Sequence, residues 1–225
     1  MLEKIKNELF SSRFGTIFML CGILVQVITA YISGDTILSV ISGVAGVISV
    51  VLCSQKKFSF YIFAWLQLIT YVFLALEQRL YGELIEYAFY AITMAYGMFI
   101  WLRHYDNESS SVKARQLSSK TNLSISILTG VAILIVANIL SRTDDTQPYL
   151  DSMSTVPAFI AQILMILRYR EQWYYWLVID VASIVMWANV GNWCMVAQFV
   201  FWAINCAYGI DKWQKTENAY GKNQL

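Results

Sequence analysis

The sequence of 225 residues contains one histidine, two prolines and few charges. A single histidine, His104, excludes a metal cluster built from several histidines, and its place beside Arg103 at a helix end does not suit a catalytic triad. No Walker-type or G-x-G-x-x-G loop is present, so nothing in the sequence predicts direct ATP hydrolysis. The four cysteines lie in or beside apolar stretches without a C-x-x-C pair, and we interpret them as small buried residues. We therefore predict no metal site, no cofactor and no catalytic residue.

The scarcity of charge also excludes a soluble protein. Charged residues make up 14% of the chain, whereas soluble domains contain about 25%. Hydrophobic residues reach 58%, and the mean hydropathy is +0.53. The net charge of +1 gives no basic face for nucleic acid. These values predict an integral membrane protein in contact with lipid.

Eight apolar windows have the length of a membrane-spanning helix. About 17 to 25 helical residues cross the roughly 30 Å of hydrocarbon in a bilayer. The windows are Thr16–Ile32, Thr36–Cys53, Phe58–Leu76, Glu83–Arg103, Leu123–Leu140, Ser152–Leu167, Trp173–Ala188 and Asn192–Lys212. The first follows a basic start, as in a signal peptide, but it is long enough to span and no clear cleavage site follows, so we interpret it as a helix. The longest connection, His104–Asn122, is polar and predicts a surface linker.

Lysine and arginine lie almost entirely on one side of this arrangement. Cytoplasmic loops of membrane proteins collect these residues. Fourteen of the 16 fall on the side of the two termini: Lys4, Lys6, Arg13, Lys56, Lys57, Arg103, Lys113, Arg115, Lys120, Arg168, Arg170, Lys212, Lys215 and Lys222. Arg79 and Arg142 fall on the other side. We predict that both termini are cytoplasmic, and for a bacterial protein that the membrane is the inner one.

The chain contains an internal repeat. FYAITMAYGMFIW (Phe89–Trp101) and FWAINCAYGIDKW (Phe201–Trp213) share seven identities at a constant offset of 112 in the numbering. The match pairs the second to fourth windows with the sixth to eighth and leaves Leu123–Leu140 as a single connector. One connecting helix gives both copies the same orientation, so the repeat is parallel.

Polar and aromatic residues occupy equivalent helix faces in the two copies. Glu86, Tyr90 and Thr93 follow the i, i+4, i+7 spacing of one helix face. The offset of 112 relates them to Gln198, Trp202 and Asn205. Two further faces are Gln67 with Tyr71, and Asp180 with Ser183 and Trp187. Parallel repeats place substrate near the bilayer midplane, where we expect these four faces to converge.

These residues also have purely structural interpretations. A buried acid such as Asp180 or Glu86 can join helices by hydrogen bonds, although acids are rarely kept in membrane spans without a role. Amides such as Gln67 can do the same, for about 0.6 to 2 kcal/mol each. Four tryptophans lie at window ends and are expected to form an interfacial belt: Trp101, Trp173, Trp193 and Trp213.

Two motifs carry a family resemblance. The run LRYREQWYYWLVIDVASIVMW contains W-x-x-W (Trp173, Trp176) followed by Asp180, and an LYGE…YG…W pattern extends from Leu80 to Trp101. Together they resemble the bacterial PnuC nicotinamide riboside transporters over about Thr36 to Trp213. Glu86 departs from the family pattern, in which many relatives have a glutamine. The first helix is additional to the seven-helix core.

The resemblance implies an all-α membrane protein with a SWEET-like fold, in which two three-helix bundles are joined by a connector helix and one extra helix precedes them. The corresponding segments are 1–35, 36–104, 105–151, 152–213 and a tail at 214–225. It implies facilitated diffusion of nicotinamide riboside, pulled by a cytoplasmic riboside kinase, and it adds Trp176 to the candidate site. Small-residue helix faces allow association, for example as a homotrimer.

Other functions share this architecture. A SWEET-type sugar carrier usually has a Pro-Gln pair, but neither Pro148 nor Pro157 precedes a glutamine. A receptor would bind ligand without flux. An enzyme is disfavoured because no nucleophile–base pair or metal set can be assembled. Asp180 and Glu86 leave proton coupling open.

Overall fold

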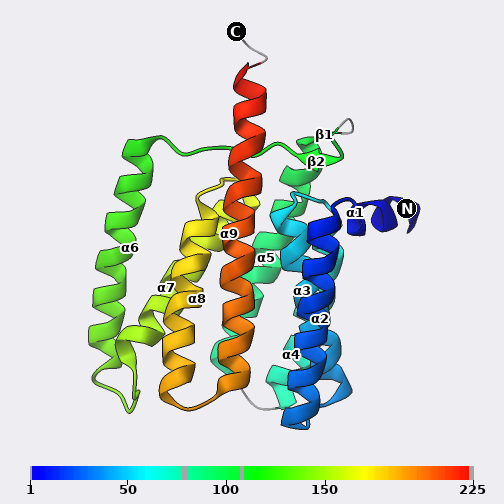
Figure 1. Cartoon of the computed structure of the whole chain (residues 1–225). Coiled ribbons are helices and arrows are strands. Elements are labelled where there is room, and N and C mark those ends of the chain that lie inside the picture. Colours follow the sequence, from blue (N-terminus) through cyan, green and yellow to red (C-terminus); the bar gives the residue numbers. More distant parts are fainter. Residues whose placement is uncertain (1, 78–80, 107–108, 223–225) are drawn as a thin grey trace. The chain divides into compact units, whose positions relative to one another are not determined.

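The computed structural model describes residues 2–77, 81–106 and 109–222. The helices are α1 (Leu2–Leu9), α2 (Arg13–Ser33), α3 (Ile37–Ser54), α4 (Phe60–Glu77), α5 (Tyr81–Arg103), α6 (Ser119–Leu140), α7 (Pro148–Ile166), α8 (Gln172–Asn189) and α9 (Trp193–Lys222). Two short strands, β1 (Tyr105–Asp106) and β2 (Ser111–Val112), form a hairpin after α5 (Figure 1). Arg79 and Leu80, on which a charge prediction and a motif rest, lie outside the described residues.

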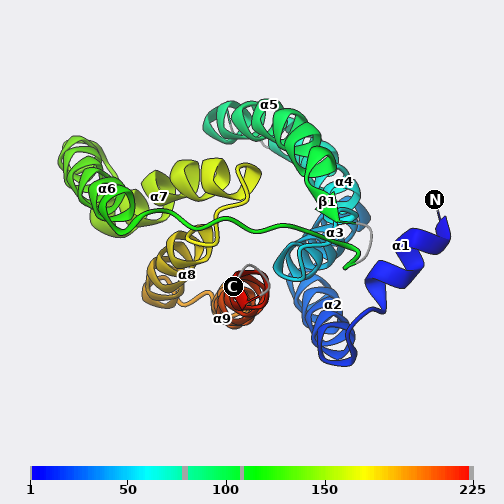
Figure 2. The ribbon, with the colours of Figure 1, turned by 90° about the horizontal axis from the view of Figure 1, so that it is seen from above.

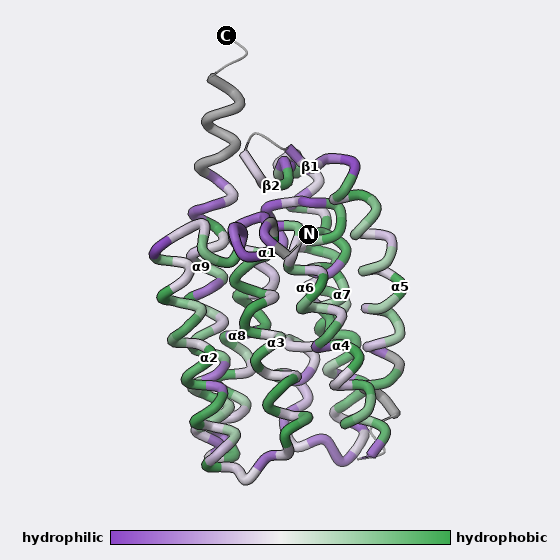
Figure 3. Tube along the Cα trace, turned by 90° about the vertical axis from the view of Figure 1, so that its right-hand side faces the viewer, coloured by the Kyte–Doolittle hydropathy of each residue, from purple (hydrophilic) through white to green (hydrophobic). Residues whose placement is uncertain are grey.

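Each of the eight predicted spans overlaps one helix from α2 to α9. Among the described residues, α2, α3, α4, α6, α7 and α9 have the length and hydropathy needed to cross a bilayer. Figure 3 shows hydrophobic residues along these helices and hydrophilic residues gathered at α1 and around the hairpin. In the described residues, helices are thus the regular structure apart from the small hairpin, which the sequence did not predict.

The chain forms two compact units. Unit 1 comprises Met1–Lys113 and unit 2 comprises Ala114–Leu225. In unit 1, α2 packs against α3, α3 against α4 and α4 against α5. In unit 2, α6, α7, α8 and α9 pack in the same successive order. Viewed from above, neighbouring helices of each unit follow one another in chain order (Figure 2).

The helix bounds follow the repeat seen in the sequence. α4 begins and ends at Phe60 and Glu77, and α8 begins and ends at Gln172 and Asn189, so both ends show the offset of 112. The first residues of α5 and α9 show the same offset. The turn before α4 contains Lys56 with φ 59°, and the equivalent residue Arg168 has φ 65°. Both units therefore have a residue with positive φ at the equivalent position of this turn, a backbone conformation that is uncommon for residues other than glycine.

Local capping determines where several helices begin. Ser12, Thr36 and Ser118 each precede a helix, and their side-chain oxygens accept hydrogen bonds from the amides of Gly15, Ser39 and Thr121. Such caps satisfy amides that have no partner within the helix. The end of α2 is fixed by Gly34, whose φ of 68° is accessible to glycine without strain.

The polar connection after α5 is bound to each unit by backbone hydrogen bonds. In unit 1 the Val112 amide donates to the Lys56 carbonyl at 3.0 Å. In unit 2 the Arg115 amide donates to the Arg168 carbonyl at 2.7 Å, and the Arg170 amide donates to the Arg115 carbonyl at 2.9 Å. The segment predicted as a surface linker thus contacts the same left-handed turn in each unit.

Candidate functional site

In unit 1 the predicted acid is bonded to the predicted aromatic residue. Glu86 and Tyr90 lie one turn apart on α5, and the Tyr90 hydroxyl donates to Glu86 Oε1. Both side chains are half-buried. The i, i+4 spacing found in the sequence therefore does place these two groups on one face. A carboxylate held by a phenol retains capacity to accept further hydrogen bonds.

A row of tyrosine rings joins this pair to α4. The Tyr71 ring stacks on Tyr87 with centroids 4.2 Å apart and an interplanar angle of 9°. Tyr87 meets Tyr90 edge-on, with centroids 5.7 Å apart. Sequence reasoning missed Tyr87, although its place next to Glu86 and three residues before Tyr90 was a usable signal. Tyr71, Tyr90 and Glu86 are thus brought together through Tyr87, which stacks on Tyr71 and meets Tyr90 edge-on.

The other two candidates of unit 1 are directed differently. The Thr93 hydroxyl donates to the carbonyls of Phe89 and Tyr90 at 2.8 and 3.1 Å, so its own helix satisfies it. Gln67 lies against α3, since a Cβ atom built on Gly46 would fall 2.8 Å from Gln67 Nε2. Gln67 therefore fills the close approach of α3 and α4.

In unit 2 the predicted acid is deeply buried. Asp180 on α8 is 4% exposed, and its Oδ2 accepts a hydrogen bond at 3.2 Å from Cys206 Sγ on α9. A thiol is a weak donor. A carboxyl group so deeply buried costs free energy unless its oxygens are fully bonded. From the sequence, Cys206 is interpreted only as a small buried residue, and because it lies on a different helix from Asp180, no sequence periodicity signals the contact.

Two other polar candidates of unit 2 share this burial. Ser183 and Asn205 are each 2% exposed. Trp202 on α9 packs edge-on against Phe199, with centroids 5.1 Å apart. The Trp202 Nε1 atom is buried without a hydrogen-bond partner among the described residues. Trp187 and Gln198 are half-buried.

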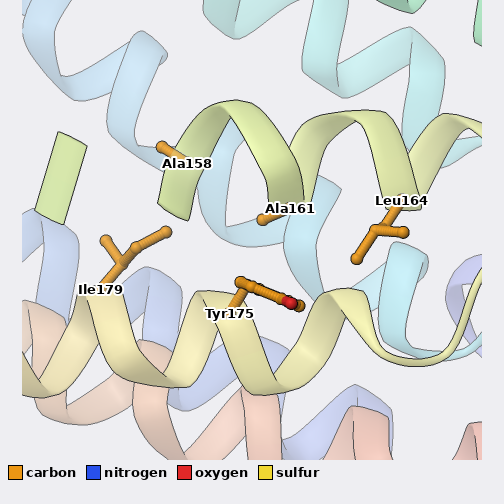
Figure 4. Close-up of a cluster of buried hydrophobic side chains, with 5 residues drawn as sticks. All are labelled: Ala158, Ala161, Leu164, Tyr175 and Ile179. Carbon is orange, nitrogen blue, oxygen red and sulfur yellow. The ribbon is translucent and has the colours of Figure 1, made fainter. Parts of the chain in front are cut away.

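Trp176 belongs to the packing between α7 and α8. It contacts the cluster of buried residues formed by Ala158, Ala161, Leu164, Tyr175 and Ile179. Figure 4 shows Tyr175 and Ile179 of α8 facing the α7 residues of this cluster. Because Trp176 is partly buried against this core, part of its ring already has a packing role.

Three of the four tryptophans assigned to an interfacial belt are buried, so that prediction was wrong for them. Trp101 and Trp213 are 0% exposed and Trp173 is 3% exposed. Trp101 packs on Phe60, and Trp173 packs on Trp213 with ring centroids 6.0 Å apart. Burial of these large rings against one another stabilises the α4–α5 and α8–α9 pairs. Trp193, 69% exposed, keeps the expected exposure.

A cavity of about 510 Å³ lies elsewhere in unit 1. It is lined by Glu3, Asn7, Glu8, Ser11, Lys57, Tyr105 and Ser110. Glu8 is 3% exposed and accepts hydrogen bonds from the Ser59 amide and the Tyr105 hydroxyl. Burial lowers the pKa of Lys57, and the charge of Glu8 partly offsets this. None of the predicted site residues lines this cavity. The hydrogen bonds of Glu8 connect α1 to the turn before α4 and to the hairpin.

The two units therefore offer different chemistry. Unit 1 presents a carboxyl group among tyrosine rings, and unit 2 has a buried carboxyl group on α8, with buried hydroxyl, amide and indole groups on α8 and α9. Among the described residues, no group of three or more histidine, cysteine, aspartate or glutamate side chains could hold a metal ion. Hydrogen bonding, ring stacking and charge attraction are interactions that these groups can make with a ligand.

The chain is similar to known proteins in sequence and in fold. Residues 36–215 match the family model described as nicotinamide mononucleotide transporter. The nicotinamide riboside transporter PnuC of Haemophilus influenzae is 30% identical over 220 residues, which cover 96% of each chain. That of Neisseria mucosa is 27% identical and covers 93% of this chain and 85% of its own. A crystal structure of the vitamin B3 transporter PnuC superposes with a TM-score of 0.77 at 27% identity, covering 96% of this chain and 97% of that one.

Proposed function

Since the chain belongs to the nicotinamide mononucleotide transporter family, we propose that it carries nicotinamide riboside across a bilayer by facilitated diffusion. It is a multi-pass membrane protein, as its apolar helices and its transporter relatives indicate. The observation that supports the proposal most is the match to the Haemophilus influenzae riboside transporter along 96% of both chains.

The charge of the spans favours the riboside over the mononucleotide. The two molecules differ by a phosphate group, which is anionic at neutral pH. The sequences of α3, α4, α7 and α8 contain no lysine or arginine. Asp180 and Glu86 would repel a phosphate within low-dielectric surroundings. A riboside without phosphate carries only the positive charge of its pyridinium ring, which these acids attract.

The remaining groups suit the other parts of the riboside. Ribose hydroxyls can donate to carboxylate or amide oxygens such as those of Asp180 and Asn205. The carboxamide needs a donor and an acceptor, which Gln198 can supply. The pyridinium ring can stack on tryptophan or tyrosine, with a cation–π attraction of about 0.5 to 2 kcal/mol.

The proposal includes the architecture and the direction of uptake. Helices α3–α5 and α7–α9 form the two parallel three-helix bundles, with α6 as connector and α2 as the extra helix. The excess of lysine and arginine supports cytoplasmic termini in a bacterial inner membrane. Phosphorylation by a cytoplasmic kinase would trap the riboside as an anion, so no ATPase motif is needed. Association into a homotrimer belongs to the same proposal.

Uptake by the purified chain in sealed proteoliposomes tests the function. We expect saturable uptake of radiolabelled nicotinamide riboside and no uptake of glucose or of the mononucleotide. Binding without uptake would instead identify a receptor, and uptake of glucose alone would identify a sugar carrier. Repeating the assay with and without a pH gradient separates diffusion from proton coupling; diffusion predicts equal rates.

Site variants test which residues bind. We expect Asp180→Ala, Gln198→Ala and Trp202→Ala to weaken riboside binding in calorimetry while the protein remains folded. Asn189→Ala is the matched control, because this amide lies exposed at the end of α8 and bonds Gln147. Wild-type affinity in all three site variants would place the binding site elsewhere.

A further inference from the structure

The contact between Asp180 and Cys206 has no counterpart in unit 1. The offset of 112 relates Asp180 to Leu68 and Cys206 to Met94. Leu68 and Met94 are 8% and 6% exposed, so the equivalent positions of α4 and α5 are also buried. At these equivalent positions, unit 1 therefore buries two apolar residues and unit 2 buries an acid bonded to a thiol.

This difference indicates that packing alone does not need the polar pair. Units with matching helix bounds accommodate leucine and methionine at these positions. Replacing buried charged groups by hydrophobic residues of similar volume is often neutral or stabilising. An acid that is 4% exposed and bonded by a weak thiol donor is costly by comparison. The pair is therefore best explained by a role other than stability.

The geometry shows what the thiol does to the acid. Cys206 Sγ donates to Asp180 Oδ2, which fixes the orientation of the carboxyl group between α8 and α9. No hydrogen bond to Oδ1 is present in the part of the chain that the structure describes, so this oxygen remains able to accept one. One turn before Cys206 on α9, the Trp202 Nε1 atom is a buried donor without a partner in the same described part.

We propose that Cys206 is a positioning residue, whose thiol holds the Asp180 carboxyl group in the orientation that receives the substrate. This rests on the proposed function, because the substrate is nicotinamide riboside. The hydroxyl or cationic ring of the riboside interacts with Asp180, and Cys206 acts only through that acid. Unit 1, with Leu68 and Met94, makes no equivalent interaction.

Single substitutions of Cys206 separate hydrogen bonding from packing. Cys206→Ala removes the donor, and we expect riboside binding in calorimetry to weaken about three- to tenfold, the usual effect of one hydrogen bond. Cys206→Ser keeps a donor and should bind within about twofold of wild type. In uptake assays the alanine variant should raise KM more than it lowers the maximal rate. A serine variant as weak as the alanine variant would overturn the positioning role.

A double-mutant cycle tests whether Cys206 acts through the acid. In an Asp180→Ala background, which leaves the thiol no side-chain acceptor at this position, Cys206→Ala should cause no further loss, since the two residues act as one unit. Losses that multiply independently would overturn the proposal. If the wild-type chain itself binds no riboside, the proposed function fails, a result that is distinct from these differences between variants.

The repeat supplies a variant that separates function from folding. Asp180→Leu combined with Cys206→Met gives unit 2 the pair that unit 1 already contains. We expect this variant to melt at or above the wild-type temperature and to lose riboside uptake. Its control is Leu68→Met in unit 1, which keeps an apolar pair and should transport normally. Full uptake by the leucine–methionine variant would show that Asp180 and Cys206 do not contribute to transport.

Discussion

The close approach of α8 and α9 at Gly209 gives a stability prediction that the structure makes quantitative. A Cβ atom built on Gly209 would lie 2.5 Å from Trp173 Cε2 and 2.6 Å from Cδ2. Favourable carbon contacts need about 3.5 Å, so the ring would have to move by about 1 Å. It has little room, because Trp173 is 3% exposed and packs on the fully buried Trp213.

The expected cost follows from two opposing effects. Forcing an extra methyl group into a packed core costs about 1 to 3 kcal/mol. Replacing glycine by alanine within a helix returns about 0.8 to 1 kcal/mol. Gly130 on α6 is the matched control, since nothing lies within 4 Å of a Cβ atom built on it. Gly130→Ala should therefore gain only the stability that alanine adds to a helix relative to glycine. The difference in unfolding free energy between Gly209→Ala and Gly130→Ala then measures the clash with Trp173.

Thermal unfolding of the two variants in detergent checks this. For a chain of this length 1 kcal/mol shifts Tm by about 2 to 4 °C. Gly209→Ala should therefore melt about 2 to 12 °C below Gly130→Ala. Trp173→Phe in the Gly209→Ala background should recover part of the loss, because the smaller ring clears the methyl group. Equal melting temperatures for the two alanine variants would refute the packing of Trp173 on Gly209.

Three further predictions concern separate contacts. Gly46→Ala should displace the flexible Gln67 side chain and so change riboside affinity as much as Gln67→Ala does, while its Tm stays near that of Gly130→Ala. If calorimetry finds unchanged affinity for Gly46→Ala and Gln67→Ala, Gln67 does not belong to the site. Glu171→Ala removes the carboxylate that accepts a hydrogen bond from the Leu117 amide at 3.1 Å, so trypsin should cut after Arg115 about tenfold faster. The control is Glu3→Ala, which removes an exposed carboxylate and should leave cleavage unchanged. Burial, reinforced by the hydrogen bond to Glu8, raises the pKa of Tyr105 to about 12, so its neutral form stabilises the folded state below pH about 10 and that contribution is lost as the pH rises towards 12. The Tm of Tyr105→Phe should therefore fall less than the Tm of wild type between pH 9 and pH 11. Parallel curves of Tm against pH for the two proteins would contradict this.

The positions of the long helices could be predicted because each depends on a local property. An uninterrupted apolar run fixes the length of a span, and polar residues with capping side chains such as Ser12 and Thr36 fix its ends. The repeat was visible because Gly97 and Trp101 recur as Gly209 and Trp213. The structure adds that Trp173 lies against both Gly209 and Trp213, a contact that the belt interpretation did not predict.

Contacts between distant segments could not be predicted from these local properties. A tryptophan at a helix end has a known depth in the membrane, but the sequence does not say whether it faces lipid or a neighbouring helix. The sequence therefore does not say whether Trp173 faces lipid, whereas the structure buries it against Trp213 of the neighbouring helix α9. Glu8 contacts Ser59 and Tyr105, which are 51 and 97 residues away, and no periodicity relates them.

For the candidate site, the sequence predicted which groups are buried better than it predicted what they contact. Asp180 was selected because an acid within an apolar helix is costly, and the structure does bury it. Its contact with Cys206 depends on the register of two helices, which the sequence does not specify. The binding role of these residues stays a prediction, which the variants above test.

The repeat separates what the scaffold requires from what the chemistry requires. The tryptophans identical in both units, Trp101 and Trp213, serve helix packing, since both are buried and contact aromatic rings of their own unit. Residues that differ at equivalent buried positions cannot serve packing in the same way. Asp180 and Cys206 are buried and hydrogen-bonded in unit 2, whereas their counterparts Leu68 and Met94 in unit 1 are buried and apolar. Polar groups that appear in only one unit are therefore the best candidates for recognising a substrate whose two ends differ, as the pyridinium and ribose of nicotinamide riboside do.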